Sequence, residues 1–279
     1  MQYIQVIFSF NAIETYQQDL LINDLAEIGF NTFEDSLNGF AAFIDADHFD
    51  ERNLLDAINN SDPDLQYSYV VTEIAAENWN EEWEKNFEPL IISDACYVRA
   101  TFHTPKSEYI YEIVIDPKMA FGTGHHQTTT MMMEYILLTD VENATVLDMG
   151  CGTGILAILA AMKGASTLVA IDNDDVCYES TKENSALNKM EHIKAICGGK
   201  ESIPNLGYDI ILANINRNIL LDQIPVYAAV LKSKGQIFFS GFYESPDLEM
   251  IGSACEALNI RYQSHKKNGE WVAAHFVKD

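Results

Sequence analysis

The stretch VLDMGCGTGIL, residues 146–156, constrains the fold more than any other part of the chain. A short apolar run leads into three alternating glycines, Gly150, Gly152 and Gly154, and a helical pattern begins at Ile155. Glycine lets the backbone turn sharply and approach a ligand closely, and a helix N-terminus offers free N–H groups. The stretch therefore predicts a buried strand, a cofactor-binding loop that includes Gly150 and Gly152, and a helix.

The sequence around this loop alternates between strand-like and helix-like runs. The strand-like runs are ATVLDMG, TLVAID, IKAICG, YDIILANI and GQIFFSGF, and helical runs such as TTTMMMEYILL, GILAILAAMKGA and DVCYESTKENSALNKM lie among them. This alternation predicts an α/β fold with a doubly wound parallel sheet. The last run, IRYQSHKKNGEWVAAHFV, predicts a C-terminal antiparallel hairpin around Asn268-Gly269.

The N-terminal part follows a different order. Residues 1–71 read as strand, helix, strand, strand, helix, strand, which predicts a small ferredoxin-like α+β domain that serves for substrate recognition. Residues 72–90 carry Trp79, Trp83 and Phe87 at a spacing of four, which predicts a linker helix packed on a neighbouring domain, or alternatively a face that binds a peptide. The catalytic domain is then expected over residues 91–279.

The charge is distributed unevenly along the chain. Residues 1–90 carry a net charge of −17 and residues 91–279 a net charge of −8. A field of this sign repels nucleic acid and attracts basic partners, so no direct nucleic-acid binding is expected, although an acidic surface also serves solubility. Because no apolar run approaches the roughly 20 residues of a membrane span and no signal peptide is recognisable, we expect a cytoplasmic protein that does not bind a membrane.

Two polar residues stand at the ends of predicted strands. Asp172 ends TLVAID, where a carboxylate can hold two ribose hydroxyls, and its alternative role is to cap the following helix. Asn214 ends YDIILAN, at the edge where open α/β sheets bind ligands, although such an asparagine also suits a turn. The last glycine of the dinucleotide fingerprint is replaced by Ile155, which disfavours NAD.

The loop MAFGTGHHQTTT, residues 119–130, is ambiguous from its residues alone. It is compatible with a phosphate loop, a metal site at His125 and His126, or a cover over another ligand. Adjacent histidines without a Cys, Asp or Glu at ligand spacing are a weak metal signal, so no metal is predicted.

The motifs together resemble a known family. VLDMGCGTG resembles the D-x-G-x-G-x-G loop of class I S-adenosylmethionine-dependent methyltransferases. AFGTGHHQTTT, LDMGCGTGILAI, AIDND and ANI, together with FEPL at residues 87–90, resemble the ribosomal protein L11 methyltransferases over nearly the whole chain. The chain departs from that family at NINR, where NILA is usual, and at His125-His126, where the family has one variable residue followed by a histidine.

The resemblance implies a protein methyltransferase. Its expected reaction moves methyl groups from S-adenosylmethionine to lysine ε-amines and the N-terminal α-amine of ribosomal protein L11. The implied cofactor contacts are Thr129, Gly150, Asp172 and Asn214, and Asn214 is also expected to position the amine. Three alternatives stay open: a small-molecule or protein-glutamine methyltransferase, a cofactor sensor without catalysis, and an NAD oxidoreductase.

Overall fold

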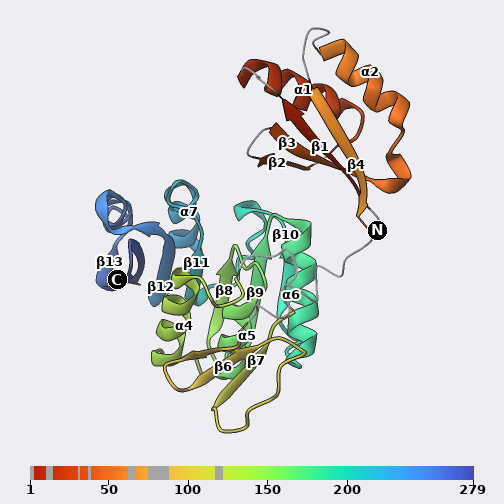
Figure 1. Ribbon diagram of the computed structural model, residues 1–279. Helices are drawn as coiled ribbons and strands as arrows, with labels where there is room; N and C mark the ends of the chain where they lie inside the picture. The colour runs from red at the N-terminus through yellow and green to blue at the C-terminus, as the bar shows by residue number, and fades with distance from the viewer. Residues whose placement is uncertain are drawn as a thin grey trace. The chain divides into compact units, whose positions relative to one another are not determined.

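The chain forms two compact units, residues 1–86 and 87–279, in a computed structural model (Figure 1). The structure describes residues 3–10, 15–30, 32–36, 39–61, 67–74, 88–116 and 122–279. Residues 75–87 of the predicted linker, which include Trp79, Trp83 and Phe87, lie outside these ranges. So do the first three residues, Met119 to Phe121, of the predicted cover.

The first unit has the predicted element order. Its elements are β1 (Tyr3–Phe10), α1 (Thr15–Glu27), β2 (Thr32–Ser36), β3 (Gly39–Asp45), a 3-10 turn η1 (Ala46–His48), α2 (Glu51–Ser61) and β4 (Tyr67–Ile74). The strands form an antiparallel sheet in the order β2-β3-β1-β4, as the ferredoxin-like arrangement requires. The core packs residues from this sheet and both helices, among them Phe8, Leu25 and Ile58.

The second unit is built on a mostly parallel sheet. Its first strands are β5 (Leu90–Ile92), β6 (Cys96–Arg99) and β7 (Tyr111–Val114), which form a separate small sheet. The main sheet contains β8 (Thr145–Met149), β9 (Thr167–Asp172), β10 (Lys194–Cys197), β11 (Tyr208–Asn214), β12 (Leu231–Tyr243), β13 (Ile260–Asn268) and β14 (Trp271–Lys278). The strand order is β10-β9-β8-β11-β12-β14-β13, and β8 to β12 run parallel. This confirms the predicted α/β sheet.

Helices cover the two faces of the main sheet (Figure 1). They are α4 (Gln127–Leu138), α5 (Ile155–Met162), α6 (Asp175–Leu187), α7 (Arg217–Val230) and α8 (Glu249–Glu256), with short turns η2 (Lys200–Ser202) and η3 (Glu244–Leu248). Alternate residues of a central strand belong to separate cores: Ile210 packs with α4 and α5, and Ile211 packs with α7 and α8. Burial on both faces explains why the strands read as continuous apolar runs.

The C-terminal hairpin is present, but its turn lies one residue later than predicted. Asn268 pairs with Trp271, so the two-residue turn is Gly269-Glu270. A positive φ of 60° occurs at Gly269 and not at Glu270, as a type II′ turn requires. The prediction treated Asn-Gly as the turn itself, whereas this turn needs its glycine at the first central position. The shift brings Trp271 to the start of β14.

A lysine fixes the far end of α4. Lys163 Nζ donates to the carbonyl oxygens of Ile136, Leu137 and Thr139 at 2.8, 2.6 and 2.9 Å. These carbonyls belong to the C-terminal end of α4, which has no further helical N–H groups to bond, and a cation is favourable at that end. Lys163 therefore helps to hold the helix whose first turn carries Thr129. None of the helices that the structure describes is long and apolar enough to cross a membrane.

Candidate active site

The glycine loop follows β8 in the conformation that its sequence predicts. Gly150, Gly152 and Gly154 have φ of 72°, 56° and 78°, a region that side chains rarely adopt. The N–H groups of Gly150 and Cys151 donate to the Ile171 carbonyl at 2.8 and 3.1 Å, which ties the loop to β9. The loop therefore lies where β8 and β9 end, at the carboxyl edge of the sheet, and α5 begins directly after it.

Gly150 is also needed for space. A Cβ atom at this position would lie 2.2 Å from Cγ2 of Ile215, the residue that follows Asn214. We expect Gly150→Ala to cost about 1–3 kcal/mol of stability, from the left-handed backbone and from overpacking. The same change should weaken cofactor binding, because Ile215 must move and Asn214 is bonded to it.

Gly252→Ala is the matched control, because nothing lies within 4 Å of a Cβ placed there and the position is helical. Chemical denaturation gives the stability of both variants, and calorimetric titration of S-adenosylmethionine gives the affinity. Equal behaviour of the two variants would contradict the steric role of Gly150.

Asp172 lies at the end of β9, and its side chain is held by the glycine loop. One carboxylate oxygen accepts from Gly152 N at 2.9 Å and the other from Asp174 N at 3.1 Å. The alternative role as a helix cap is taken by Asp174, whose carboxylate accepts from Val176 N at 2.7 Å at the start of α6. Each oxygen of Asp172 has a further lone pair, so the carboxylate can still accept from two hydroxyls.

Thr129 and Asn214 are 85 residues apart in sequence and meet in the structure. Asn214 Nδ2 donates to Thr129 Oγ1 at 3.3 Å. Thr129 is buried in the first turn of α4, and Asn214 is the last residue of β11. Asn214 Oδ1 is buried and has no hydrogen-bond partner among the residues that the structure describes. A buried acceptor of this kind is costly unless a ligand satisfies it.

The predicted cover packs against the glycine loop through hydroxyl groups. Thr153 Oγ1 donates to the Gly122 carbonyl at 2.5 Å, and Thr130 Oγ1 donates to the Gly124 carbonyl at 2.9 Å. Gly122 and Gly124 both have positive φ. Residues 122–130 are thus tied both to the loop before α5 and to the start of α4.

The paired histidines have different partners. His125 Nε2 lies 2.8 Å from the Glu88 carbonyl, and His126 Nδ1 lies 2.7 Å from Thr128 Oγ1. His126 caps the N-terminus of α4 by accepting from Thr128 N at 3.3 Å. Each ring therefore helps to shape this loop and the first turn of the helix.

Asp148 is a further buried carboxylate beside the glycine loop, and it is not among the site residues that the sequence predicts. It lies two residues before Gly150 on β8 and is 1% exposed. Its Oδ2 accepts from Ala157 N at 3.1 Å, whereas Oδ1 is without a partner within the described part of the chain. Burial raises the pKa of Asp148 to about 7, the charge of Asp172 adds to the rise, and the Ala157 N–H opposes it.

This raised pKa predicts a pH-dependent stability. The folded protein holds the Asp148 proton more tightly than the unfolded chain does, and this stabilises the fold. The contribution is complete below about pH 4, the pKa of the carboxyl in the unfolded chain, and it is lost as pH rises through about 7, the pKa in the folded protein. The Asp148→Asn variant cannot ionise at this position. Its stability relative to wild type should therefore increase between about pH 4 and 7, by at most about 1.4 kcal/mol per pH unit.

Urea unfolding at several pH values, with no cofactor added, measures the effect of Asp148→Asn. Glu191→Gln, at an exposed position, is the control. Parallel pH curves for wild type and Asp148→Asn would show that Asp148 does not titrate in this range.

An aromatic pocket lies at the same edge of the sheet. Tyr243 ends β12, Trp271 begins β14, and the two residues pair in register with ring centroids 4.6 Å apart. Gln127, Tyr243, Ser245, Gly269, Glu270 and Trp271 line a cavity of about 420 Å³. The Trp271 ring also meets His126 edge to face at 5.0 Å. We call this cavity the acceptor pocket. The first turn of α4 contributes Gln127 to its lining and also carries Thr129, which bonds Asn214.

Sequence reasoning missed this pocket, since Tyr243 and Trp271 are remote from the recognised motifs. The available signal was the hairpin itself, which returns the chain to the carboxyl edge of the sheet. Gly241, inside the strand-like run GQIFFSGF, is a second signal, because a glycine within a strand often marks a bulge; the structure has a β-bulge between Ser240 and Phe242, with a φ of 92° at Gly241. Bulges of this kind often re-aim side chains beside active sites.

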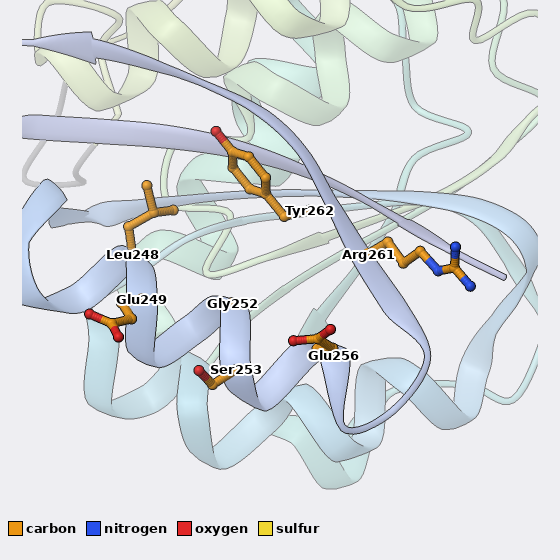
Figure 2. A pocket seen from close by; sticks show the side chains of 7 residues that line it. All are labelled: Leu248, Glu249, Gly252, Ser253, Glu256, Arg261 and Tyr262. Carbon is orange, nitrogen blue, oxygen red and sulfur yellow. The ribbon is translucent and has the colours of Figure 1, made fainter.

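A larger cavity of about 580 Å³ lies between α8 and the start of β13 (Figure 2). Glu249, Ser253 and Glu256 come from the helix, and Arg261 and Tyr262 come from the strand (Figure 2). β13 runs in the same direction as β12, so its start lies at the opposite edge of the sheet from the glycine loop. The larger cavity is therefore separate from the candidate active site.

Comparisons with known proteins agree with this geometry. The family described as ribosomal protein L11 methyltransferase (PrmA) matches residues 12–279. The chain is 42% identical to the ribosomal protein L11 methyltransferase of Phocaeicola vulgatus over 99% of each chain. It is 39% identical to that of Bacteroides thetaiotaomicron, over 99% of this chain and 100% of the relative.

A solved structure gives the same result. The crystal structure of a ribosomal protein L11 methylase from Lactobacillus delbrueckii subsp. bulgaricus matches with a TM-score of 0.64 and 31% identity, over 69% of this chain and 100% of that one. The parallel sheet ended by an antiparallel hairpin is that of class I methyltransferases. The chain therefore belongs to the ribosomal protein L11 methyltransferase (PrmA) family and is a methyltransferase.

Proposed function

We propose that this chain transfers methyl groups from S-adenosylmethionine to lysine ε-amines and the N-terminal α-amine of ribosomal protein L11. The relatives that it matches over their full length are named for that protein. The observation that carries the proposal is the buried Asn214 Oδ1, which accepts no hydrogen bond from the described residues and lies at the carboxyl edge of the sheet.

The residues at this edge suit S-adenosylmethionine. The backbone at Gly150 and Gly152 allows close approach, and the Asp172 carboxylate would hold the two ribose hydroxyls. Thr129 and Asn214 would hold the methionine part, whose amino group can donate to a buried oxygen. When bound, the cofactor supplies a methyl group activated by a positively charged sulfur.

The protein then has to position a neutral amine and exclude water. The Thr129 bond fixes the amide of Asn214 and leaves Oδ1 able to accept an N–H group of the cofactor or of the incoming amine. A hydrogen bond of that kind aligns the nitrogen lone pair with the reacting carbon. Orientation and desolvation are the main sources of rate in such a displacement.

Lysine must lose a proton before it reacts. At pH 7 a lysine with a pKa near 10.4 is neutral in only about 0.04% of molecules, which corresponds to about 4.6 kcal/mol. Burial in the site and a nearby positive charge both lower that pKa, so water can take the proton without a strong base. An N-terminal α-amine, with a pKa of about 7.7–8.0, needs much less help.

The acceptor pocket suits the approach of such an amine. The faces of Tyr243 and Trp271 attract ammonium groups, and they do so whether or not the nitrogen already carries methyl groups. Glu270, also in the lining, adds an attractive negative charge. The pocket would thus receive a lysine from solution and direct it towards Asn214.

The acidic first unit would bind the protein substrate. Ribosomal proteins are generally basic, and residues 1–90 carry a net charge of −17. Complementary charge speeds encounter and fixes orientation. Substrate recognition is accordingly assigned to residues 1–71 and the linker to residues 72–90. The cytoplasm, where ribosomal proteins assemble, is the proposed location.

The test is methyl transfer to purified ribosomal protein L11 with isotopically labelled S-adenosylmethionine, followed by mass spectrometry of the intact protein and its peptides. Label on lysine side chains and the N-terminus is the expected result. Free amines and glutamine-containing peptides, tested in parallel, represent the alternative substrates. Label on those alone would overturn the proposal.

A further inference from the structure

Arg217 begins α7 three residues after Asn214, within the NINR sequence that departs from the family pattern. Its Nη1 donates to Asp247 Oδ1 at 2.7 Å, while Nε and Nη2 donate to Asn218 Oδ1 at 3.1 and 3.0 Å. Both ends of the guanidinium group are therefore engaged. Such a planar, multiply bonded contact fixes geometry more strongly than a single point charge does.

Asp247 transmits this contact to β12. Asp247 is 6% exposed and lies in η3, the turn that follows β12. Its second oxygen, Oδ2, accepts from the backbone N–H of Tyr243 at 3.1 Å. One carboxylate thus joins the start of α7 to the last residue of β12, directly before the chain leaves the sheet.

Tyr243 is the last residue of β12 and pairs with Trp271 at the start of β14. Tyr243 is 48% exposed, and within the described residues Trp271 is the aromatic ring that its own ring contacts. The bulge at Gly241 lies two residues before it. Because a bulge bends its strand, the bond from Asp247 to the Tyr243 N–H helps to fix the direction in which the end of β12 points.

We propose that Arg217 is a positioning residue that acts through Asp247 to set Tyr243 in the acceptor pocket. This inference rests on the proposed function, because it assigns Tyr243 and Trp271 to the protein substrate. Within the described residues, the side-chain hydrogen bonds of Arg217 go to Asp247 and Asn218 and not to Asn214 or Thr129. Its effect is therefore on the use of the protein substrate and not on cofactor affinity.

Four variants of the full-length chain test the inference: Arg217→Ala, Arg217→Lys, Asp247→Ala, and the double variant Arg217→Ala with Asp247→Ala. For each, KM and kcat for ribosomal protein L11, the dissociation constant of S-adenosylmethionine and the thermal midpoint are measured. Asp247→Ala should raise KM about five- to twentyfold and leave cofactor affinity within about twofold of wild type. Arg217→Lys keeps the charge and should raise KM less.

The double variant separates positioning from folding. Arg217→Ala leaves the buried Asp247 carboxylate without its charged partner, whereas removing both residues does not, so the double variant should recover thermal stability relative to Arg217→Ala. Tyr243 N–H still lacks its acceptor, so KM should stay raised. If KM returned to the wild-type value together with the thermal midpoint, the pair would be purely structural and the inference overturned.

Lys232→Ala is the matched control, because it removes the Lys232–Asp209 ion pair at the opposite edge of the same sheet. It should leave KM unchanged. If the wild-type chain methylates ribosomal protein L11 and all four variants share its KM, this inference alone is overturned. If the wild-type chain methylates no amine of that protein, the proposed function fails and this inference fails with it.

Discussion

Replacing Asn214 with alanine is expected to lower kcat about a hundredfold with both substrates saturating, because a misplaced reacting group costs on that scale. The reason is local: Asn214 Oδ1 is a buried acceptor without a partner in the described structure, and its amide is held by Thr129. Single-turnover kinetics with a preformed cofactor complex would separate this effect from product release. A wild-type rate in Asn214→Ala would remove the residue from the mechanism.

A matched pair at Thr129 tests the same arrangement from the other side. Thr129→Ser keeps the hydroxyl that bonds Asn214, whereas Thr129→Val removes it and nearly keeps the shape. Thr129 is 1% exposed, so the valine remains buried and leaves the Asn214 amide nitrogen unsatisfied. We expect Thr129→Val to approach the Asn214→Ala rate and Thr129→Ser to stay near wild type. Asn205→Ala, at an exposed loop position, is the control.

Removing residues 1–86 is expected to lower kcat/KM for ribosomal protein L11 by about a hundredfold or more, with S-adenosylmethionine binding unchanged. Among the described residues, the core of the first unit is built from residues up to Tyr69, and the cores of the second unit are built from residues from Leu90 onward, so the units share no core residue. The second unit can thus keep its glycine loop, Asp172 and Asn214 without the first. Calorimetry of cofactor binding and steady-state methylation are the two measurements.

Charge neutralisation tests whether the acidic surface causes this loss. Glu51 and Asp56 are exposed on α2, and Glu249 and Glu256 are exposed on α8 of the second unit. The pair Glu51→Gln and Asp56→Asn should raise KM for the protein substrate, whereas Glu249→Gln with Glu256→Gln should not. High salt should raise the wild-type KM and reduce this difference. Full methylation by residues 87–279 alone would contradict a recognition role for the first unit.

Much of the fold follows from short-range patterns. A strand buried on both faces reads as a continuous apolar run, which is why β8, β9 and β11 were predictable. Glycines with positive φ are likewise a local requirement of the loop before α5. The hairpin was predictable from Asn268-Gly269, but its one-residue shift was not, because the register depends on pairing with β12.

The candidate site likewise has residues that the sequence predicts and contacts that it does not. Gly150, Gly152, Asp172 and Asn214 could be identified from sequence because each stands at a strand end, and parallel strands bring their carboxyl ends to one edge. The bond between Thr129 and Asn214, the use of Asp174 and not Asp172 as the cap of α6, and the unpartnered oxygens of Asp148 and Asn214 required coordinates. Each depends on the direction of a side chain, which strand and helix periodicity does not specify.

The sequence by itself determined the α/β class, the glycine loop, the acidic first unit and the family, since these depend on residues close together along the chain or on overall charge. Only the tertiary structure decided that Tyr243 and Trp271 form one pocket with the first turn of α4, and that Arg217 reaches Tyr243 through Asp247. The Arg217–Asp247 bond joins residues 30 positions apart, and the pocket joins the first turn of α4 to the distant C-terminal hairpin. The positions of these residues depend on the bulge at Gly241, on the hairpin register and on the turn after β12. No short-range sequence pattern specifies that combination.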